Sequence, residues 1–246
     1  MPGHLDRITQ AHKVEEKEPK FSAKAAKLIV LLTAGLLAFS ILLYGFVSLF
    51  GGGISRGGHS ASTQQLEVIV GNSALRIPAN TIRFQSQRHA GAHGRIELYL
   101  HWPTLSGYND VLEASFSRAS DQSDLIFLSL EPRTMSLDMS GRIEPIYSRF
   151  FDGPAKKASA GLIRQPLSPD GGFIDEDLYY EASSPYPFVT RCARPKSTIS
   201  TPFCIRDIHV GKDLMLTYRF HVRHLPDWIK IDRRIRQYAK ALLITR

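Results

Sequence analysis

Hydrophobic positions along the chain follow three patterns, and the first is an unbroken apolar run. Leu28 to Phe50 are 23 successive uncharged and mostly apolar residues. As an α-helix they would extend about 35 Å, at about 1.5 Å per residue, which is enough for a hydrocarbon core of about 30 Å. A helix that is apolar on every face needs a large protein or a lipid bilayer around it, and 246 residues are too few to bury it. The run therefore predicts one N-terminal transmembrane helix over residues 28–50.

The second pattern, after residue 65, has a period of two, which is typical of half-buried strands. In 213–222 the even positions are apolar, and the odd positions, including His221, are expected to face solvent. Turn residues such as Gly71-Asn72 and Gly211-Lys212 separate the segments. We expect a mainly β domain over 65–246, an antiparallel β-sandwich or open barrel. The expected strands are 66–70, 95–101, 124–130 and 213–222, with weaker candidates at 82–84, 112–116, 178–181, 188–191 and 205–210.

The third pattern has helical spacing and follows Pro226 at the C-terminus. Proline suits the first position of a helix, where its missing N–H costs nothing. Apolar side chains then recur at steps of three and four, while the basic residues fall mainly elsewhere. We expect an amphipathic helix that closes the β domain. The alternative is a basic helix that lies on the membrane surface as a sensor. The apolar positions are Trp228, Ile231, Ile235, Tyr238 and Leu242.

Charges beside the apolar run predict its orientation. Lys20, Lys24 and Lys27 precede it, whereas only Arg56 follows before Glu67. By the positive-inside rule the N-terminus is cytoplasmic and the rest is outside. We therefore expect a disordered cytoplasmic tail over 1–27 and a Gly/Ser-rich linker over 51–64. A cleaved signal peptide is the alternative, but its apolar core is normally 7–15 residues long, which favours an uncleaved anchor.

The formal net charge is +8 and the pI about 9.6. Such a balance would indicate nucleic acid for a soluble protein. For a domain outside the membrane we expect no nucleic-acid partner, and interpret the charge as solubility or weak attraction to anionic envelope polymers and headgroups. The chain has no Asn-x-Ser/Thr sequon, which favours a bacterial protein. The predicted location is the inner membrane, with one span and a periplasmic C-terminal domain.

Cys192 and Cys204 are the two cysteines of the chain, and both fall in the exported part. An even count in an oxidising compartment predicts a disulfide. A zinc site is the alternative, but zinc ligands are usually two to four residues apart, and eleven residues intervene here. We therefore predict no metal and no cofactor.

Two further segments are candidate binding sites. His89 and His93 have the i, i+4 spacing of helical metal ligands, but glycines around them favour a solvated loop. His101, Trp102 and Tyr108 end a strong strand and form a possible ligand contact, in which the aromatic rings would stack on a sugar. Core packing is the more frequent role of such aromatics, and we favour it.

No catalytic motif occurs in the sequence. Gly-x-Ser-x-Gly, Ser-x-x-Lys, His-Glu-x-x-His and phosphate-binding glycine loops are all missing, so catalytic residues stay unknown. We favour a non-catalytic binding or accessory domain for an envelope protein or polysaccharide. The alternative is a membrane-tethered envelope hydrolase with an unrecognised active site. A deep pocket with convergent titratable groups would indicate the hydrolase.

Overall fold

The computed structural model describes residues 22–50, 57–117, 124–194 and 202–244. The chain divides into two compact units, Met1–Gly52 and Gly53–Arg246. Most of the predicted tail (1–27), the first six residues of the predicted linker (51–56) and most of the segment between the cysteines (195–201) lie outside the described residues. The limits predicted for tail, anchor, linker and domain stay predictions.

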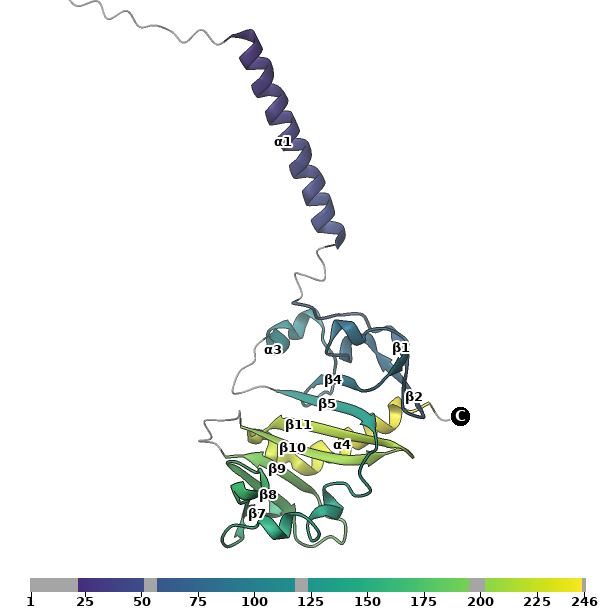
Figure 1. Cartoon of the computed structure of the whole chain (residues 1–246), viewed down its shortest axis with the longest axis vertical. Coiled ribbons are helices and arrows are strands. Elements are labelled where there is room, and N and C mark those ends of the chain that lie inside the picture. Colours follow the sequence, from purple (N-terminus) through teal and green to yellow (C-terminus); the bar gives the residue numbers. More distant parts are fainter. Residues whose placement is uncertain (1–21, 51–56, 118–123, 195–201, 245–246) are drawn as a thin grey trace, which may run out of the picture. The chain divides into compact units, whose positions relative to one another are not determined.

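The first unit contains the helix α1 (Ala23–Phe50) (Figure 1). Its segment Ala23–Phe46 is long and apolar enough to cross a membrane, with a mean hydropathy of 2.4 over its most apolar window. Leu36, Leu42 and Tyr44 each expose more than two thirds of their surface, as expected of side chains that face lipid. The predicted apolar N-terminal helix is therefore confirmed. Such a helix serves as an anchor or as a signal sequence.

The strands of the second unit form two sheets within the described residues. The large sheet is antiparallel, with the order β4-β5-β11-β10-β9-β8-β7-β6, and the small sheet has the order β2-β1-β3. β1 pairs antiparallel with β2 and parallel with β3. The strands are β1 (Gln65–Val70), β2 (Ser73–Pro78), β3 (Gly91–His93), β4 (Ile96–His101), β5 (Leu125–Pro132), β6 (Lys156–Lys157), β7 (Leu162–Pro166), β8 (Glu176–Glu181), β9 (Val189–Ala193), β10 (Phe203–Val210) and β11 (Leu214–His221).

Helices of the second unit are short apart from the C-terminal one. α3 (Glu113–Ser117) follows the 3-10 turn η3 (Asp110–Leu112), and α4 (Trp228–Leu242) follows η8 (Val222–Asp227). Pro226 thus lies in η8, just before α4, and not at the first position of α4. The other 3-10 turns are η1 (Ala79–Thr81), η2 (Gln85–Gln87), η4 (Ser140–Arg142), η5 (Tyr147–Phe150), η6 (Ser159–Gly161) and η7 (Pro169–Gly171).

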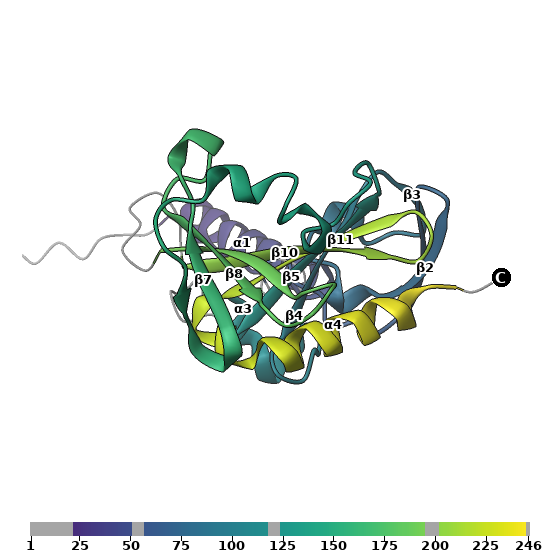
Figure 2. The ribbon, with the colours of Figure 1, turned by 90° about the horizontal axis from the view of Figure 1, so that it is seen from below.

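α4 runs along one face of the large sheet (Figure 2). Its apolar stripe lies in the same core cluster as β4, β5, β10, β11 and the small sheet. Trp228 and Ile235 are buried there, so this stripe is covered by protein. The predicted closing helix is confirmed, and the stripe is not available to a membrane surface. On β11 the even positions of the predicted alternation are confirmed, since Leu214, Leu216, Tyr218 and Phe220 are fully buried, but Met215 and His221 on the opposite side are buried as well.

The fold class predicted from the sequence needs a correction. The fold is mixed α/β, and one open eight-stranded sheet with α4 on it takes the place of a sandwich or barrel. The antiparallel pairing and the C-terminal helix were predicted correctly. Segment 112–116 is helical, because Asn109 caps η3 by accepting a hydrogen bond from the Leu112 N–H, and acidic residues begin both turns. Segment 82–84 makes only a single bridge, between Ile82 and Leu98.

Candidate functional site

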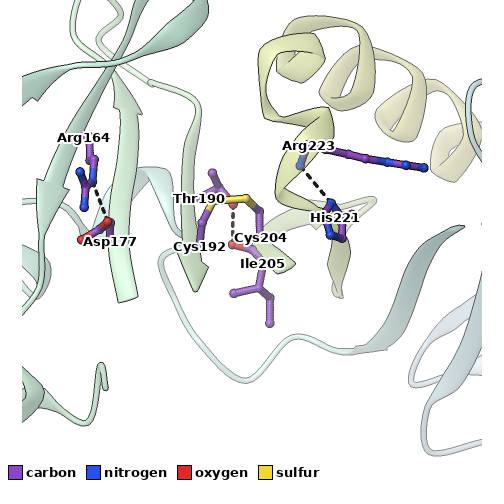
Figure 3. The surroundings of a disulfide bond; sticks show 8 residues. All are labelled: Arg164, Asp177, Thr190, Cys192, Cys204, Ile205, His221 and Arg223. Atoms are coloured by element: carbon purple, nitrogen blue, oxygen red, sulfur yellow. Dashed lines mark hydrogen bonds and ion pairs between the residues drawn. A yellow bond between two sulfur atoms is a disulfide. The ribbon is translucent and has the colours of Figure 1, made fainter. Parts of the chain in front are cut away.

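The predicted disulfide is present between β9 and β10 (Figure 3). Cys192 and Cys204 lie directly opposite each other, with their Cα atoms 3.9 Å apart. Both are buried, and beside them Thr190 Oγ1 donates to the carbonyl of Ile205 at 2.8 Å. Disulfides persist in oxidising compartments, so this bond favours a location outside the cytoplasm.

His221, which we expected to be exposed, is buried at the end of β11. Its Nδ1 accepts a hydrogen bond from the Arg223 N–H at 3.1 Å (Figure 3), and its ring meets Phe203 edge to face. The expectation was wrong because the ring of Phe203 on the neighbouring strand and the backbone of Arg223 pack against the imidazole.

The three residues of the possible ligand contact lie in different surroundings. Trp102 belongs to the main core, and the guanidinium of Arg234 lies 5.9 Å from its ring centre. Tyr108 is fully buried in a second cluster, with Tyr99 and Phe116. His101 is half-buried. The burial of both aromatic rings agrees with core packing, and contact of this trio with a ligand stays a prediction.

His59, inside the predicted linker, closes the Tyr108 cluster. Its ring stacks on Tyr108 at 4.9 Å and on Tyr99 at 5.6 Å, and its Nδ1 lies 3.0 Å from the Tyr99 hydroxyl. Arg88 donates to the carbonyl of Gly58 at 2.6 Å. Residues 58 and 59 therefore belong to the folded unit. The sequence did not predict this packing of His59, because a histidine that follows several glycines is typical of a flexible linker.

The surroundings of His59 predict a pH-dependent stability. Burial, and then the positive charge of Arg88, lower the pKa of His59 below its ordinary value of 6.5. Below pH 6.5 the unfolded chain binds more protons at this histidine than the folded chain does. The contribution of His59 to the free energy of unfolding is therefore present above pH 6.5. It is lost as the pH falls toward the lowered pKa that His59 has in the folded chain. We expect a smaller drop in urea midpoint between about pH 7.5 and 5.5 for His59→Gln than for the parent.

His89→Gln is the matched control for that measurement, because His89 is exposed and lies outside the cluster. It should keep the parental pH dependence. If His59→Gln and His89→Gln reduced the pH-dependent drop in urea midpoint equally, the packing of His59 would not be the cause of that drop.

The i, i+4 histidines lie at β3 and not on a helix. His89 and His93 stack at 4.4 Å, and His93 Nε2 lies 3.1 Å from the carbonyl of His89. Among the described residues, no group of three or more His, Cys, Asp or Glu side chains could hold a metal ion.

Two titratable groups with shifted pKa values, Asp232 and Tyr218, belong to a buried network between β10, β11 and α4. Arg206, 1% exposed, donates to Asp232 Oδ1 at 3.1 Å and to the carbonyl of Val189 at 2.6 Å. The Tyr218 hydroxyl donates to the same Oδ1 at 2.8 Å, and Arg236 Nε donates to Oδ2 at 2.8 Å. Burial alone would raise the pKa of Asp232, but the two guanidinium groups lower it below its ordinary value. The pKa of the Tyr218 phenol is raised by burial and by Asp232.

This network has the character of a structural cross-link. Each carboxylate oxygen of Asp232 accepts from a charged donor, and the network connects α4 to the strand beneath it. None of its side chains lines the grooves at Trp102, at β1–β3 or on the open sheet face that the structure describes. The arrangement stabilises the fold.

The opposite face of the large sheet carries a groove of about 360 Å³. Register places Phe127 of β5 opposite Arg219 of β11, and both point away from α4. The Arg83 guanidinium lies 4.9 Å from the ring centre of Phe127, and that of Arg219 lies 5.5 Å from it. Arg83 also lies 4.9 Å from the ring of Phe84, which is 44% exposed. We call this feature the open-face groove; it is lined by Arg83, Phe84, Arg95, Glu97, Phe127, Ser129, Glu131, Thr217 and Arg219, with Leu128 beneath.

Charges in the open-face groove are only partly neutralised. Arg95 pairs with Glu97 at 3.0 Å, and Ser129 donates to the same carboxylate at 3.0 Å. Arg83 and Arg219 make no ion pair within the described part of the chain. Two cations held against an aromatic ring, without a protein carboxylate, can bind an anionic group from outside.

The open-face groove lies between two covered ends of the same face. At one end the cluster of Tyr99, Tyr108, Phe116 and Leu125 packs over β4 and β5. At the other, Leu178 and Val189 lie under the segment around Tyr147. The sequence did not reveal the groove, because it separates Arg83 from Arg219 by more than half the chain. Arg219 on the polar side of a predicted strand was the single local signal.

Comparisons with known proteins show a shared fold. No family model matches the chain, and no curated protein is similar to it in sequence. An immunity protein of the Stenotrophomonas maltophilia type IV secretion system has a similar structure, with a TM-score of 0.50 and 13% identity over 76% of this chain and 96% of that one. The iron-regulated outer membrane lipoprotein FrpD of Neisseria meningitidis aligns with a TM-score of 0.48 and 12% identity, over 75% of this chain and 95% of that one.

Proposed function

We propose that the chain is a single-pass bacterial inner-membrane protein whose periplasmic domain binds a protein partner and catalyses nothing. The N-terminus would be cytoplasmic, residues 28–50 would anchor the chain, and residues 51–64 would connect the anchor to the domain at 65–246. The apolar helix α1, the lysines that precede its uncharged run and the disulfide support this arrangement.

The open-face groove carries the proposal for binding. Arginine and aromatic side chains are the residues most enriched where proteins bind each other, and this groove combines them on the face of the large sheet opposite α4. The fold adds support, because the solved structure that aligns over 76% of this chain is described as an immunity protein of a secretion system. A protein partner is therefore favoured over a polysaccharide.

The alternative of a tethered envelope hydrolase has less support. It needs titratable groups that converge in a cavity, with pKa values adjusted for catalysis. Asp232 of α4 and the buried Tyr218 of β11, whose pKa values are both shifted, are hydrogen-bonded to each other between the helix and the sheet. Their arrangement favours a structural role over a reaction with substrate.

Topology is the first prediction of the proposal. A reporter fused after Arg56 should be active if it functions only outside the cytoplasm, such as a phosphatase that needs disulfides, because the lysines before the apolar run at residue 28 hold the N-terminus inside. A cytoplasm-only fluorescent reporter at the same point should be dark. The opposite pair of signals would reverse the orientation and place the disulfide in a reducing compartment.

Partner binding is tested by photo-crosslinking of the full-length protein in its native membranes. A photoreactive phenylalanine in place of Phe84, on the rim of the groove, should give a discrete protein adduct. The same group in place of Val111, which is 93% exposed outside the groove, is the matched control and should give no such adduct. If neither position yields an adduct, or both yield the same one, partner binding at this groove is wrong.

A further inference from the structure

We infer that the open-face groove binds an extended acidic segment of a partner protein, through carboxylates that pair with Arg83 and Arg219. This inference rests on the proposed protein-binding function and adds the chemistry of the partner. It follows from the placement of the two guanidinium groups, from the change of charge along β5 and from the concave shape of the site.

The two arginines are arranged to receive carboxylates. Each guanidinium lies against the Phe127 ring, at 4.9 Å and 5.5 Å, which places one side of it on an apolar surface, while Arg219 itself stays exposed. A stacked guanidinium keeps its N–H donors at its edge, where they can pair in bidentate fashion with a carboxylate. Since neither arginine has an ion-pair partner among the described residues, a ligand carboxylate would displace only water.

Sugar or lipid ligands fit this groove less well. Sugar stacking needs a free aromatic face, and the Phe127 ring is already covered by Arg83 and Arg219. A bilayer surface needs a broad convex patch of basic and apolar groups, whereas this site is a groove that also contains Glu97 and Glu131.

Charge changes sign along the groove, which selects against a uniform polyanion. Phe127, Ser129 and Glu131 lie two residues apart on β5 and point to the same side. At about 3.3 Å per residue, Glu131 lies about 13 Å along the strand from Phe127. A complementary ligand is therefore acidic at the Arg83–Arg219 end and neutral or basic at the Glu131 end. A peptide segment can alternate in this way, whereas an acidic polysaccharide repeats one charge.

The experiment uses the full-length protein in nanodiscs and a short dye-labelled peptide with two glutamates at one end and two lysines at the other. The parent should bind this peptide more tightly than an all-glutamate peptide, polygalacturonate or phosphatidylglycerol vesicles. Arg219→Glu should weaken binding about tenfold or more, because it removes a charge-assisted hydrogen bond and adds repulsion. Arg233→Glu makes the same charge change on the exposed side of α4 and should leave binding within about twofold.

Two further variants separate site-specific pairing from general charge. Arg219→Gln removes the charge without reversing it, so it should also weaken binding if the protein keeps the parental unfolding midpoint. Glu131→Arg should reverse the preference, so that the all-glutamate peptide binds better than the mixed one. The inference would be overturned if Arg219→Glu and Arg233→Glu lost equal affinity for the mixed peptide. It would also be overturned if the parent bound polygalacturonate or the vesicles more tightly than this peptide.

Failure of this inference differs from failure of the proposed function. A protein adduct at position 84 that Arg83→Glu and Arg219→Glu leave unchanged would support partner binding and overturn the acidic segment. Partner binding and the acidic segment would both be supported by three results together. The adduct is lost in Arg83→Glu and in Arg219→Glu, it is retained in Arg233→Glu, and the crosslinked partner peptide is rich in Asp or Glu.

Discussion

Replacing Asp232 with asparagine should lower the free energy of unfolding by about 3–5 kcal/mol. The reason is Arg206, which is 1% exposed and would keep its charge in the core without the carboxylate that now faces it at 3.1 Å. An arginine side chain does not become neutral in a protein, because its guanidinium keeps its proton. Because Arg206 and Arg236 lower the pKa of Asp232, the contribution should be present near neutral pH and disappear as the pH falls through the lowered pKa, below about 4.

Asp227→Asn is the matched control for Asp232→Asn. Asp227 also pairs with a basic side chain on this helix, Lys230 at 3.1 Å, but both partners are exposed, so the loss should be about 0–1 kcal/mol. Arg206→Met in the Asp232→Asn background should recover part of the stability, because it removes the unpaired charge. Urea unfolding followed by circular dichroism measures all four proteins. Similar losses for Asp232→Asn and Asp227→Asn would show that the network contributes little.

Elements with a strong local period were predictable from the sequence. The alternation of β11 requires one face to be buried, and the stripe from Trp228 to Leu242 requires a core-facing helix, so neither depends on distant residues. The disulfide was predictable from two cysteines and their compartment. Short elements were not predictable, since α3 depends on the Asn109 cap and β6 (Lys156–Lys157) depends only on pairing with β7.

The sites depend on contacts between distant residues, and this explains why the sequence did not reveal them. Arg206 and Asp232 lie on different elements and look like ordinary surface charges in their own segments. Phe127 acquires its two cations from β11 and from the segment before η2, through a strand order that no local pattern encodes. His59 follows five glycines, yet it packs among aromatic rings.

The disulfide and the Arg206 network lie at the same seam of the large sheet, the boundary between β9 and β10. Within the described residues β9 meets β10 in a short ladder, with Cys192 opposite Cys204 and Ile205 opposite Arg191. Arg206 crosses the same seam to the carbonyl of Val189. The ladder connects the strands that carry the open-face groove to β9, β8, β7 and β6. We therefore attribute the cohesion of the two parts of the sheet to these two features.

Replacing both cysteines with serine should lower the free energy of unfolding by about 2–5 kcal/mol, the range typical of native disulfides in small secreted domains. The bond spans 12 residues, and closing a loop of that size contributes about 3 kcal/mol in the chain-entropy model. Reduction of the parent by dithiothreitol in urea should move its midpoint toward that of the variant. Unchanged midpoints in both experiments would show that the disulfide is dispensable.

The same variant tests whether the seam acts as one unit. Loss of the bond between Cys192 and Cys204 should increase amide hydrogen exchange in β8 and β9 more than in β4 and β5, because the short ladder would then depend on hydrogen bonds alone. Adding Asp232→Asn to the variant should give a loss that differs from the sum of the separate losses, since Arg206 lies two residues from Cys204 and bonds across the same seam. Additive losses with uniform exchange would mean that the two features stabilise the sheet independently.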